Sequence, residues 1–453
     1  MVLIFVTSLN YVPVLAALFK YRRLIAGFIL LWMLPAMLVS GHDGNASMSA
    51  EQPKLQEEID FTFYGKFLSA VKTKPVKVKS VRENDVLHAW YAYQRRKDMA
   101  PVIASLRSLS KELGLNDWFV FGLVRHYADG LLRKAPPRDR VVLEHFLLAG
   151  MGYDVRLGRT EQQLVLLLPI DQDVYEHYYI HIDDKDYYIF YDDLEYNPKE
   201  VSTIHPCDPS YISFGKGKTF SLLFDSKGLN MSFGDEMSCD FDDGQIHITC
   251  RVSPGVMRML RDYPVMDMDY YASTAVLPQF LDDVVKQLLP QIEGMDQCAA
   301  AEALLQFVQS AFGYVDDFNQ FGREKYCFVE ENFFYSKNDC DDRSILYAYL
   351  VKTLLGLDVQ FVHFPGHDCT GVRFTQCSPR GIGYQYGDDY YLICDPSYMG
   401  AGIGKCMPGF RHSQPSVQRR THKSTSKGNH SFLMPQLDKK DVPKGITVTP
   451  VEK

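Results

Sequence analysis

One cysteine of the sequence stands where a helix start would activate it as a nucleophile. Cys340 is followed by Asp341 and Asp342, and an apolar run at helical spacing then continues to Gly356. Acidic residues in a first turn and glycine after a last turn are typical of helix ends, so we expect a helix to begin at or near Cys340. Unpaired N–H groups at that end favour the thiolate, which is a nucleophile at neutral pH.

A cysteine nucleophile needs a base and a group that orients the base. His363 lies inside an apolar run that predicts a strand, whereas His367 follows a Pro-Gly turn and opens the next strand. We therefore assign the base to His367 and a structural role to His363. Asp395, at the end of a later predicted strand, is the candidate that orients the imidazole. Because acidic neighbours raise a thiol pKa, thiolate formation at Cys340 should depend on pairing with His367.

The same chemistry needs donors for the oxyanion that develops on the attacked carbonyl. The backbone N–H of Cys340 is the first candidate, and Gln320 and Tyr326 remain alternatives for a second donor.

Gly400–Gly404 resembles a phosphate-binding loop only in its glycines, because it lacks the lysine and the strand–loop–helix setting, and we expect an ordinary loop there. The cysteines show no zinc spacing, so the sequence predicts no metal and no cofactor.

In order and setting, these residues resemble the transglutaminase-like family of papain-type thiol enzymes. That family carries Cys-x-Asp at a helix start, then a histidine that opens a strand, then Asp-Pro at a strand end. Cys340 with Asp342, His367, and Asp395 with Pro396 match this pattern. The resemblance spans residues 256–410. It implies a domain whose helical part packs on an antiparallel sheet and a Cys-His-Asp triad that forms a thioester.

Two short segments sharpen the resemblance, and two departures limit it. Residues 321–325 and 395–398 look like a bacterial exported subset of the family. The usual His-Ala-Trp is replaced by His367-Asp368-Cys369, so the aromatic residue after the base is missing. The 28 residues from His367 to Asp395 exceed the distance in many members. Both departures concern the substrate and the rate more than the fold.

An internal echo of the candidate domain occurs at a constant offset of 203 residues. The matching positions are Asp139-Arg140 with Asp342-Arg343, Asp186-Tyr187-Tyr188 with Asp389-Tyr390-Tyr391, and Asp192 with Asp395. Gly152-Tyr153-Asp154-Val155 matches Gly356-Leu357-Asp358-Val359 with a one-residue slip. Cys340 then falls on Pro137, and His367 falls on Gln163 or Leu164. This predicts a degenerate copy without thiol chemistry, a scaffold or docking surface; chance similarity of two helix-then-hairpin segments is the alternative.

The pattern of residues at the N-terminus indicates an export signal. Leu24–Val39 is an apolar run of 16 residues that follows a basic cluster and precedes small polar residues 40–44. Residues 1–19 form a second uncharged stretch, which leaves three interpretations: a later true start, an unusually long signal, or a membrane hairpin. We expect export to the periplasm or cell envelope and a mature chain that begins near residues 41–45. Membrane association through residues 1–39 is the alternative.

Composition excludes several classes of protein. The 453 residues are 46% hydrophobic and 23% charged, which is ordinary for a folded globular chain and excludes a disordered or fibrous one. A net charge of −8 argues against a dedicated nucleic-acid binder. The expected partner is therefore a protein or peptide substrate in the cell envelope. The sequence does not predict an oligomeric state. Cys239 and Cys250 flank a predicted turn, and whether they form a disulfide or stay free thiols is left open.

Hydrophobic periodicity predicts an α+β fold. Helical spacing runs from Asp85 to Met151 and returns in three later segments; strands are expected at 164–168, 178–182, 187–191, 220–224 and 246–252, and again at 359–364, 371–374 and 390–394. The predicted organisation is a signal or membrane segment (1–44), a linker and N-terminal extension (45–84), an α+β domain that is the candidate copy (85–255), a catalytic domain (256–410) and a basic tail (411–453).

The sequence therefore predicts an exported thiol enzyme that cleaves amide or peptide bonds through Cys340, His367 and Asp395. Hydrolysis is favoured over amine transfer. The rival hypothesis is a non-catalytic envelope binding or scaffold protein that keeps the fold for interaction.

Overall fold

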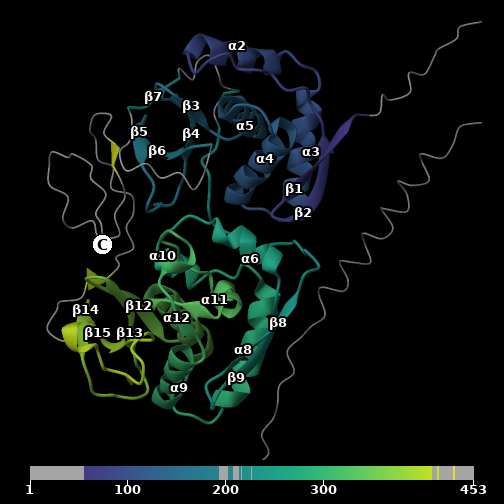
Figure 1. The fold of residues 1–453 in the computed structure, drawn as a ribbon. Coiled ribbons are helices and arrows are strands. Elements are labelled where there is room, and N and C mark those ends of the chain that lie inside the picture. Colours follow the sequence, from purple (N-terminus) through teal and green to yellow (C-terminus); the bar gives the residue numbers. More distant parts are fainter. Residues whose placement is uncertain are drawn as a thin grey trace, which may run out of the picture. The chain divides into compact units, whose positions relative to one another are not determined.

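The computed structural model describes residues 56–192, 203–207, 214–215, 217–225, 227–410 and 416–417, and the backbone of 432–433. The chain from Gln56 onward forms one compact unit of mixed α+β structure (Figure 1). The predicted signal segment, the first part of the predicted linker and most of the basic tail lie outside the described residues.

The first half of this unit is a hairpin, a set of helices and a sheet. The hairpin is β1 (Glu58–Phe63) with β2 (Lys66–Val71), within the segment predicted as linker and extension. The helices are α2 (Glu83–Gln94), α3 (Met99–Glu112), α4 (Asp117–Leu132) and α5 (Pro137–Met151). The strands that follow are β3 (Arg156–Arg159), β4 (Leu164–Pro169), β5 (Tyr179–Ile182), β6 (Lys185–Phe190) and β7 (His205–Pro206).

The second half also opens with a hairpin, β8 (Met237–Asp242) and β9 (His247–Val252). Its helices are α6 (Pro254–Arg261), α7 (Met268–Tyr271), α8 (Pro278–Ile292), α9 (Gln297–Ser310), α10 (Asp317–Gln320), α11 (Val329–Tyr335) and α12 (Cys340–Leu355). Its strands are β10 (Gly313–Tyr314), β11 (Lys337–Asn338), β12 (Asp358–Phe364), β13 (His367–Arg373), β14 (Gly383–Tyr386), β15 (Asp389–Cys394) and β16 (Ser416–Val417). A 3₁₀ turn, η1, covers Pro408–Phe410, and β17 is Phe432–Leu433.

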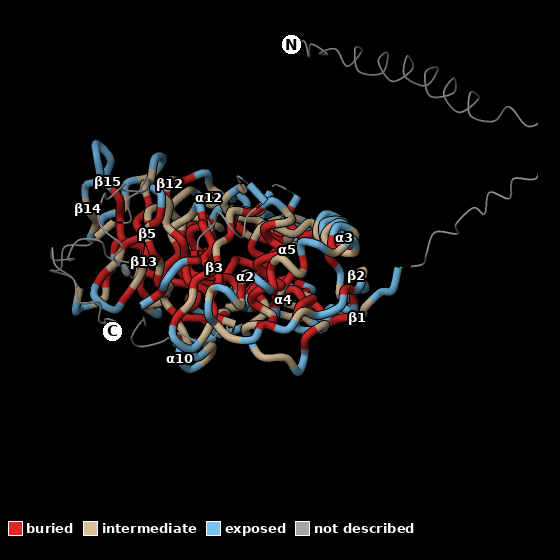
Figure 2. Tube along the Cα trace, turned by 90° about the horizontal axis from the view of Figure 1, so that it is seen from above, coloured by how far each residue is buried: buried red, intermediate tan, exposed pale blue. Residues whose placement is uncertain are grey.

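Each half is centred on a helix that is buried around most of its circumference. α5 begins with Pro137, whose missing N–H is harmless at a first helical position, and ends at Gly152 in the left-handed conformation. α12 ends in the same way at Gly356. Buried residues lie on nearly all sides of both helices, with Glu144 and His145 among them in α5 and Asp342 and Arg343 in α12, as expected of helices that lie inside a core. Figure 2 shows buried residues gathered around α4, α5 and β3.

The sheets of the two halves share one strand order. In the first sheet the strands lie in the order β5-β6-β4-β3, with β7 beside β3 and β17 beside β5. In the second sheet the order is β14-β15-β13-β12, with β16 beside β12. All neighbouring strands in both sheets are antiparallel.

The strand registers agree as well, at an offset of 204 residues. The pair Leu157–Leu166 corresponds to Phe361–Thr370, Leu168–Tyr188 to Val372–Leu392, and Tyr179–Tyr188 to Gly383–Leu392. The helix starts differ by 203, and α12 is one residue longer than α5, with 16 residues against 15. That extra residue accounts for the one-residue slip at Gly152 and Gly356. The constant offset of 203 is wrong for the strands that follow: by register Gln163 corresponds to His367, and Tyr191, not Asp192, corresponds to Asp395.

The predicted strand at 220–224 is wrong. Only Phe220 makes an isolated bridge, with Ile170. The backbone of Leu222 is instead bound by side chains: its carbonyl accepts from Tyr263, Tyr270 and Asn116. A segment whose backbone groups are satisfied by buried side chains has no need of a neighbouring strand.

One disulfide is present, between Cys298 at the start of α9 and Cys377 in the loop after β13. Cys239 and Cys250 lie opposite each other in the β8–β9 ladder, but both are free thiols. The disulfide considered between them is therefore absent from the structure.

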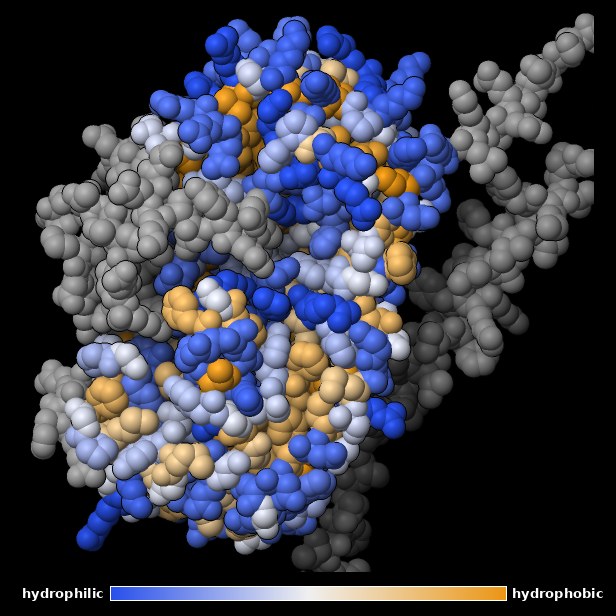
Figure 3. Space-filling model, viewed as in Figure 1, coloured by the Kyte–Doolittle hydropathy of each residue, from blue (hydrophilic) through white to orange (hydrophobic). Residues whose placement is uncertain are grey.

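The visible face of the molecule is largely hydrophilic, with apolar side chains more frequent over the second half (Figure 3). Within the part of the chain that the structure describes, no helix is both long and apolar enough to cross a bilayer.

Candidate active site

His367 and Asp395 lie together at one end of the second sheet. His367 is the first residue of β13, after a turn in which Gly366 has a φ of 69°, and Asp395 follows the last residue of β15. Because β13 and β15 are antiparallel neighbours, the start of one meets the end of the other. The Nε2 atom of His367 is 2.8 Å from Oδ2 of Asp395, and both residues are buried.

The Asp395 carboxylate is held on both oxygens. Its Oδ1 accepts hydrogen bonds from the Ser397 backbone and hydroxyl, at 3.1 and 2.9 Å, and from the Tyr398 N–H at 3.1 Å. The Gln309 amide donates to the Asp395 carbonyl at 2.9 Å. These bonds fix the carboxylate against His367, as an orienting group requires.

The imidazole of His367 is fixed by stacking as well. Its ring lies 5.2 Å from the Phe410 ring at an interplanar angle of 7°, and Phe410 stacks in turn on Phe364. The sequence lacks an aromatic residue directly after this histidine, and Phe410 provides an aromatic contact from a distant position. With Nε2 bound to Asp395, Nδ1 is the nitrogen left to exchange a proton with another group.

Cys340 is the first residue of α12, as predicted, and lies against the start of β13. The Asp368 backbone hydrogen-bonds its sulfur. The Ser344 hydroxyl donates to the carbonyls of Cys340, at 2.7 Å, and Asp368, at 3.4 Å, which ties the helix start to the strand. Cys340 is thus bound to the residue that follows His367. Within the described chain no hydrogen bond joins Cys340 to His367 itself.

Electrostatics around Cys340 oppose ionisation of the thiol. Burial raises the pKa of Cys340 well above its ordinary value, and the charges of Asp341, Asp339 and Asp368 raise it further. The backbone hydrogen bond from Asp368 acts in the opposite direction but is smaller. Burial and the three carboxylates therefore favour the neutral thiol over the thiolate at Cys340.

His363 has a more specific environment than the sequence indicated. Its Nδ1 is 2.6 Å from Oδ1 of Asp368, on the neighbouring strand, and the pair is partly exposed. His363 therefore binds one of the carboxylates that act on Cys340, whereas His367 binds Asp395.

The two candidates for a second oxyanion donor differ. Gln320 closes the short helix α10, and its side chain makes no hydrogen bond within the described residues. Tyr326 is 1% exposed, and its hydroxyl has no hydrogen-bond partner there. Burial raises the pKa of Tyr326, and the charges of Asp368 and Asp341 raise it further. Of the two, Tyr326 is the one with a buried hydroxyl that has no partner among the described residues.

Residues 400–404 form a loop, as predicted. Gly400 N–H donates to the Gln309 side chain and Gly404 N–H to the Ile393 carbonyl. The first of these bonds, together with the bond that the Gln309 amide donates to the Ala401 carbonyl at 2.9 Å, connects the loop to the same glutamine that holds Asp395.

An acidic cluster beside Cys340 was missed by the sequence analysis. Asp317 in α10 lies close to Asp339 and Asp341, and all three are buried. Burial and the neighbouring carboxylates, Asp342 above all, raise the pKa of Asp317 to about 9. Asp317 lies 22 residues before Asp339, and no motif connects them. The only available signal was the acid-rich stretch from Asp339 to Asp342.

The matching location in the first half has different chemistry. Pro137 begins α5, where the second half has Cys340, and by strand register Gln163 stands where the second half has His367. Asp192 forms an ion pair with Arg140, with Nε of the arginine 2.9 Å from Oδ1. This half offers no thiol or imidazole at these positions.

No protein-family model matches this chain, and no curated protein matches it.

Proposed function

We propose that this protein is an exported transglutaminase-like thiol hydrolase that cleaves amide or peptide bonds with Cys340, His367 and Asp395. The observation that carries the proposal is the buried His367–Asp395 pair, whose imidazole is stacked and held through Nε2, next to a cysteine that opens a helix. A nucleophile at a helix start, with a base that is oriented by a third group, is the arrangement that such chemistry requires.

In the proposed reaction the Cys340 sulfur attacks the carbonyl carbon of the substrate while Nδ1 of His367 takes the thiol proton. A C–S bond forms, and the carbonyl electrons move to oxygen. The imidazolium then gives its proton to the leaving amine as the C–N bond breaks, which leaves a thioester on Cys340. Water attacks the thioester with His367 again as base and releases the acid. An amine in place of water would complete transfer instead.

The raised pKa of Cys340 determines how the first step proceeds. Because the resting sulfur is a neutral thiol, proton transfer to His367 accompanies the attack and does not precede it. Asp395, held by Ser397 and Tyr398, stabilises the positive charge on the imidazole during that step. The backbone N–H of Cys340 and the Tyr326 hydroxyl are the proposed donors to the oxyanion.

We infer that the first half is a copy of the same unit without thiol chemistry. The shared strand order, the matching registers at one offset and the equivalent helix starts support this inference. A copy with proline and glutamine at the reactive positions serves as a scaffold or a docking surface for the substrate.

A non-catalytic binding protein is the second candidate. Two observations favour it: Cys340 and His367 are not hydrogen-bonded to each other, and three carboxylates surround the thiol. In that case the second half has kept the fold while its cysteine is inert.

Hydrolysis of p-nitrophenyl acetate separates the two candidates, because an acylated thiol releases nitrophenol before water attacks. The proposal predicts that the wild-type chain releases a burst of about one equivalent and that Cys340→Ser releases none. Cys239→Ser, at another partly exposed free cysteine, is the matched control and should retain the burst. Equal release by wild type and Cys340→Ser would favour the binding-protein alternative.

A further inference from the structure

A cavity of about 290 Å³ is lined by residues from both halves of the chain. The first half contributes Trp118, from the first turn of α4, and His177, which lies just before β5. The second half contributes residues 261–264, at the end of α6, and residues 321–323, which follow α10. The three residues of the proposed triad are not among those that line it. Ligand sites often lie where two structural units meet, so this cavity is a candidate for a second site.

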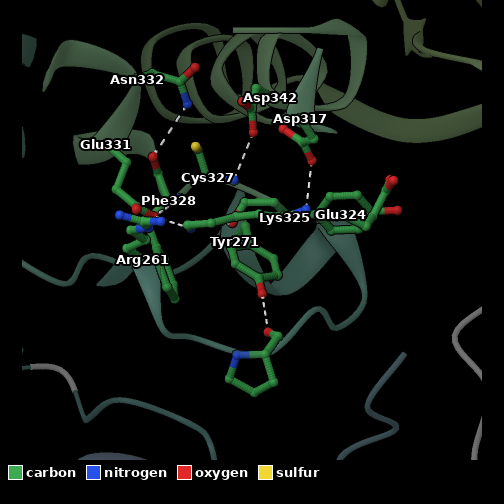
Figure 4. A network of polar contacts seen from close by, with 12 residues as sticks. Arg261, Tyr271, Asp317, Glu324, Lys325, Cys327, Phe328, Glu331, Asn332 and Asp342 are labelled. Atoms are coloured by element: carbon green, nitrogen blue, oxygen red, sulfur yellow. Dashed lines mark hydrogen bonds and ion pairs between the residues drawn. The ribbon is translucent and has the colours of Figure 1, made fainter. Parts of the chain in front are cut away.

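Contacts outside the cavity hold its walls in place. Trp118 is 5% exposed, and its ring lies 5.4 Å from that of Phe190 and 6.4 Å from that of Tyr263. The Tyr271 hydroxyl donates to the Pro264 carbonyl at 2.5 Å, a bond that Figure 4 draws. Because these walls are already ordered, a ligand would not have to order them when it binds.

Two guanidinium groups line the cavity, and most of their donors are unused. Arg323 donates from Nη1 to the Glu324 carbonyl at 3.1 Å and from Nη2 to the Arg261 carbonyl. A guanidinium has five N–H donors, so three remain. The Arg261 side chain is exposed, and within the part of the chain that the structure describes it makes no hydrogen bond or ion pair. Asp262, the one carboxylate of the lining, hydrogen-bonds the Tyr64 hydroxyl. The two guanidinium groups are therefore free to bind a carboxylate, which fits their planar geometry.

His177 adds a hydrogen-bond acceptor to the lining and no charge. Burial, and to a smaller extent the charge of Arg323, lowers the pKa of His177 to about 4, so its imidazole is neutral at pH 7. Its Nδ1 lies 3.2 Å from the Tyr175 carbonyl, which can only accept, so Nδ1 carries the proton. Nε2 is then an acceptor. A ligand that carries an N–H group beside its carboxylate would satisfy both the arginines and this nitrogen.

Aromatic rings supply the apolar part of the lining. Trp118, Tyr263 and Phe321 all contribute to it. Such rings bind another aromatic ring by stacking or by edge contacts. The volume of about 290 Å³ lies at the lower limit of ligand sites, which occupy about 300–1,000 Å³. The cavity therefore has room for one amino-acid residue and is too small for a nucleotide.

We propose that this cavity binds the C-terminal residue of a peptide that ends in an aromatic amino acid. The terminal carboxylate binds Arg261 and Arg323, the amide N–H of the same residue donates to Nε2 of His177, and the aromatic side chain packs on Trp118. Binding does not depend on the sulfur of Cys340. A Cys340→Ser chain that binds the peptide end would therefore separate this proposal from the proposed hydrolysis.

Calorimetric titration of the full wild-type and Cys340→Ser chains with N-acetyl-phenylalanine tests the site. The expected result is one ligand per chain with the same Kd in both. N-acetyl-phenylalaninamide lacks the carboxylate and N-acetyl-alanine lacks the ring, so each should bind at least about tenfold more weakly. Arg261→Gln should weaken binding of N-acetyl-phenylalanine by at least about tenfold. Arg258→Gln is the matched control: Arg258 lies in the same helix but pairs with Asp235 outside the cavity, so Kd should stay the same.

Tryptophan fluorescence of the wild-type chain keeps the proposal testable if Arg261→Gln fails to fold, because the ligand would lie against Trp118. A change that saturates with N-acetyl-phenylalanine and is absent with the amide supports the site. A wild-type chain with no binding heat and no fluorescence change would overturn it, and so would equal binding of the acid and the amide. A loss in Arg258→Gln as large as in Arg261→Gln would overturn the assignment to this cavity.

Two further ligands test the identity of the bound group. Binding of N-acetyl-alanine as tight as that of N-acetyl-phenylalanine would overturn the assignment of an aromatic side chain. A tetrapeptide that ends in phenylalanine should bind the Cys340→Ser chain at least as tightly as N-acetyl-phenylalanine does. If the tetrapeptide does not bind, the assignment to a peptide end is overturned in favour of a small free acid.

Discussion

The two halves of the chain place different residues on closely similar frames. A buried helix precedes four antiparallel strands in the same order and register in each. Three corresponding positions then differ between the first and second halves: Pro137 against Cys340 at the helix start, Gln163 against His367 at the strand start, and Tyr191 against Asp395 after the hairpin. Two halves of similar fold therefore carry side chains of different chemistry at three corresponding positions.

The halves also differ in the connection that leads to the central helix. Residues 133–136 join α4 to α5, whereas residues 311–339 join α9 to α12. The longer connection supplies several buried polar residues, among them Asp317, Lys325 and Glu331, which Figure 4 draws. The chemistry of the second half therefore depends on an inserted segment as well as on substitutions within the shared frame.

The largest effect is expected from a pair of substitutions at aspartates that lie just after β15 and just after β6. Asp395→Asn keeps the shape but disturbs the tautomer and orientation of His367, so hydrolysis of p-nitrophenyl acetate should fall by up to about 10⁴-fold. Asp192→Asn removes a carboxylate that binds only arginine, so the rate should stay the same. Steady-state kinetics measure both. Similar losses in the two variants would show that the difference between the halves has no catalytic meaning.

The inserted segment should also contribute to stability. Lys325→Met leaves the Glu331 carboxylate buried without its partner, and the free energy of unfolding should fall by about 3–5 kcal/mol. Lys286→Met breaks an exposed pair with Asp283 and should cost less than about 0.5 kcal/mol. Urea unfolding compares the two. A cost at Lys325 as small as that at Lys286 would contradict the importance of the buried network.

Hydrophobic periodicity and turn residues predicted many of the helices and strands. The helix from Cys340 to Gly356 and the strand that His367 opens follow from local patterns, and both are present. The strand expected at 220–224 is absent because buried tyrosines bind that backbone, which no local pattern reveals.

The candidate site was only partly visible in the sequence. The sequence predicted that His367 and Asp395 meet, and they do. Phe410 and Asp317 come close to these residues and to Cys340 through long-range packing, which the sequence did not predict. Their positions depend on how distant segments fold together. The neutral state of the Cys340 thiol likewise follows from burial, which spacing alone does not show.

A smaller difference between the halves concerns pH. Burial raises the pKa of Glu144 in α5 from 4.5 to about 7. The folded chain then keeps a proton that the unfolded chain loses between these values, so this stabilising contribution is full below pH 4.5 and is lost as pH rises through 7. Glu144→Gln should remove the loss, gaining up to about 3 kcal/mol relative to wild type between pH 5 and pH 8. Urea unfolding at both pH values measures it; a difference that does not vary with pH would contradict the assignment.

The smallest effect is expected at the other histidine of the site. His363→Gln removes an imidazole that binds Asp368 and leaves His367 and Asp395 in place. Hydrolysis should change by less than about threefold, as for a residue outside the reacting groups. A loss as large as that of a His367→Gln chain, in the same kinetic assay, would show that the base has been assigned to the wrong histidine.

The central claim is that Cys340 reacts because His367 accepts its proton. Site-resolved alkylation tests this claim most directly. Iodoacetamide labelling, followed by peptide mass spectrometry between pH 6 and pH 9, gives separate rates for Cys340 and for the partly exposed Cys239. We predict that Cys340 reacts faster than Cys239 in the wild-type chain and at least about tenfold more slowly in His367→Gln, with Cys239 unchanged. A Cys340 rate that does not depend on His367, or that stays below that of Cys239 throughout, would contradict the account.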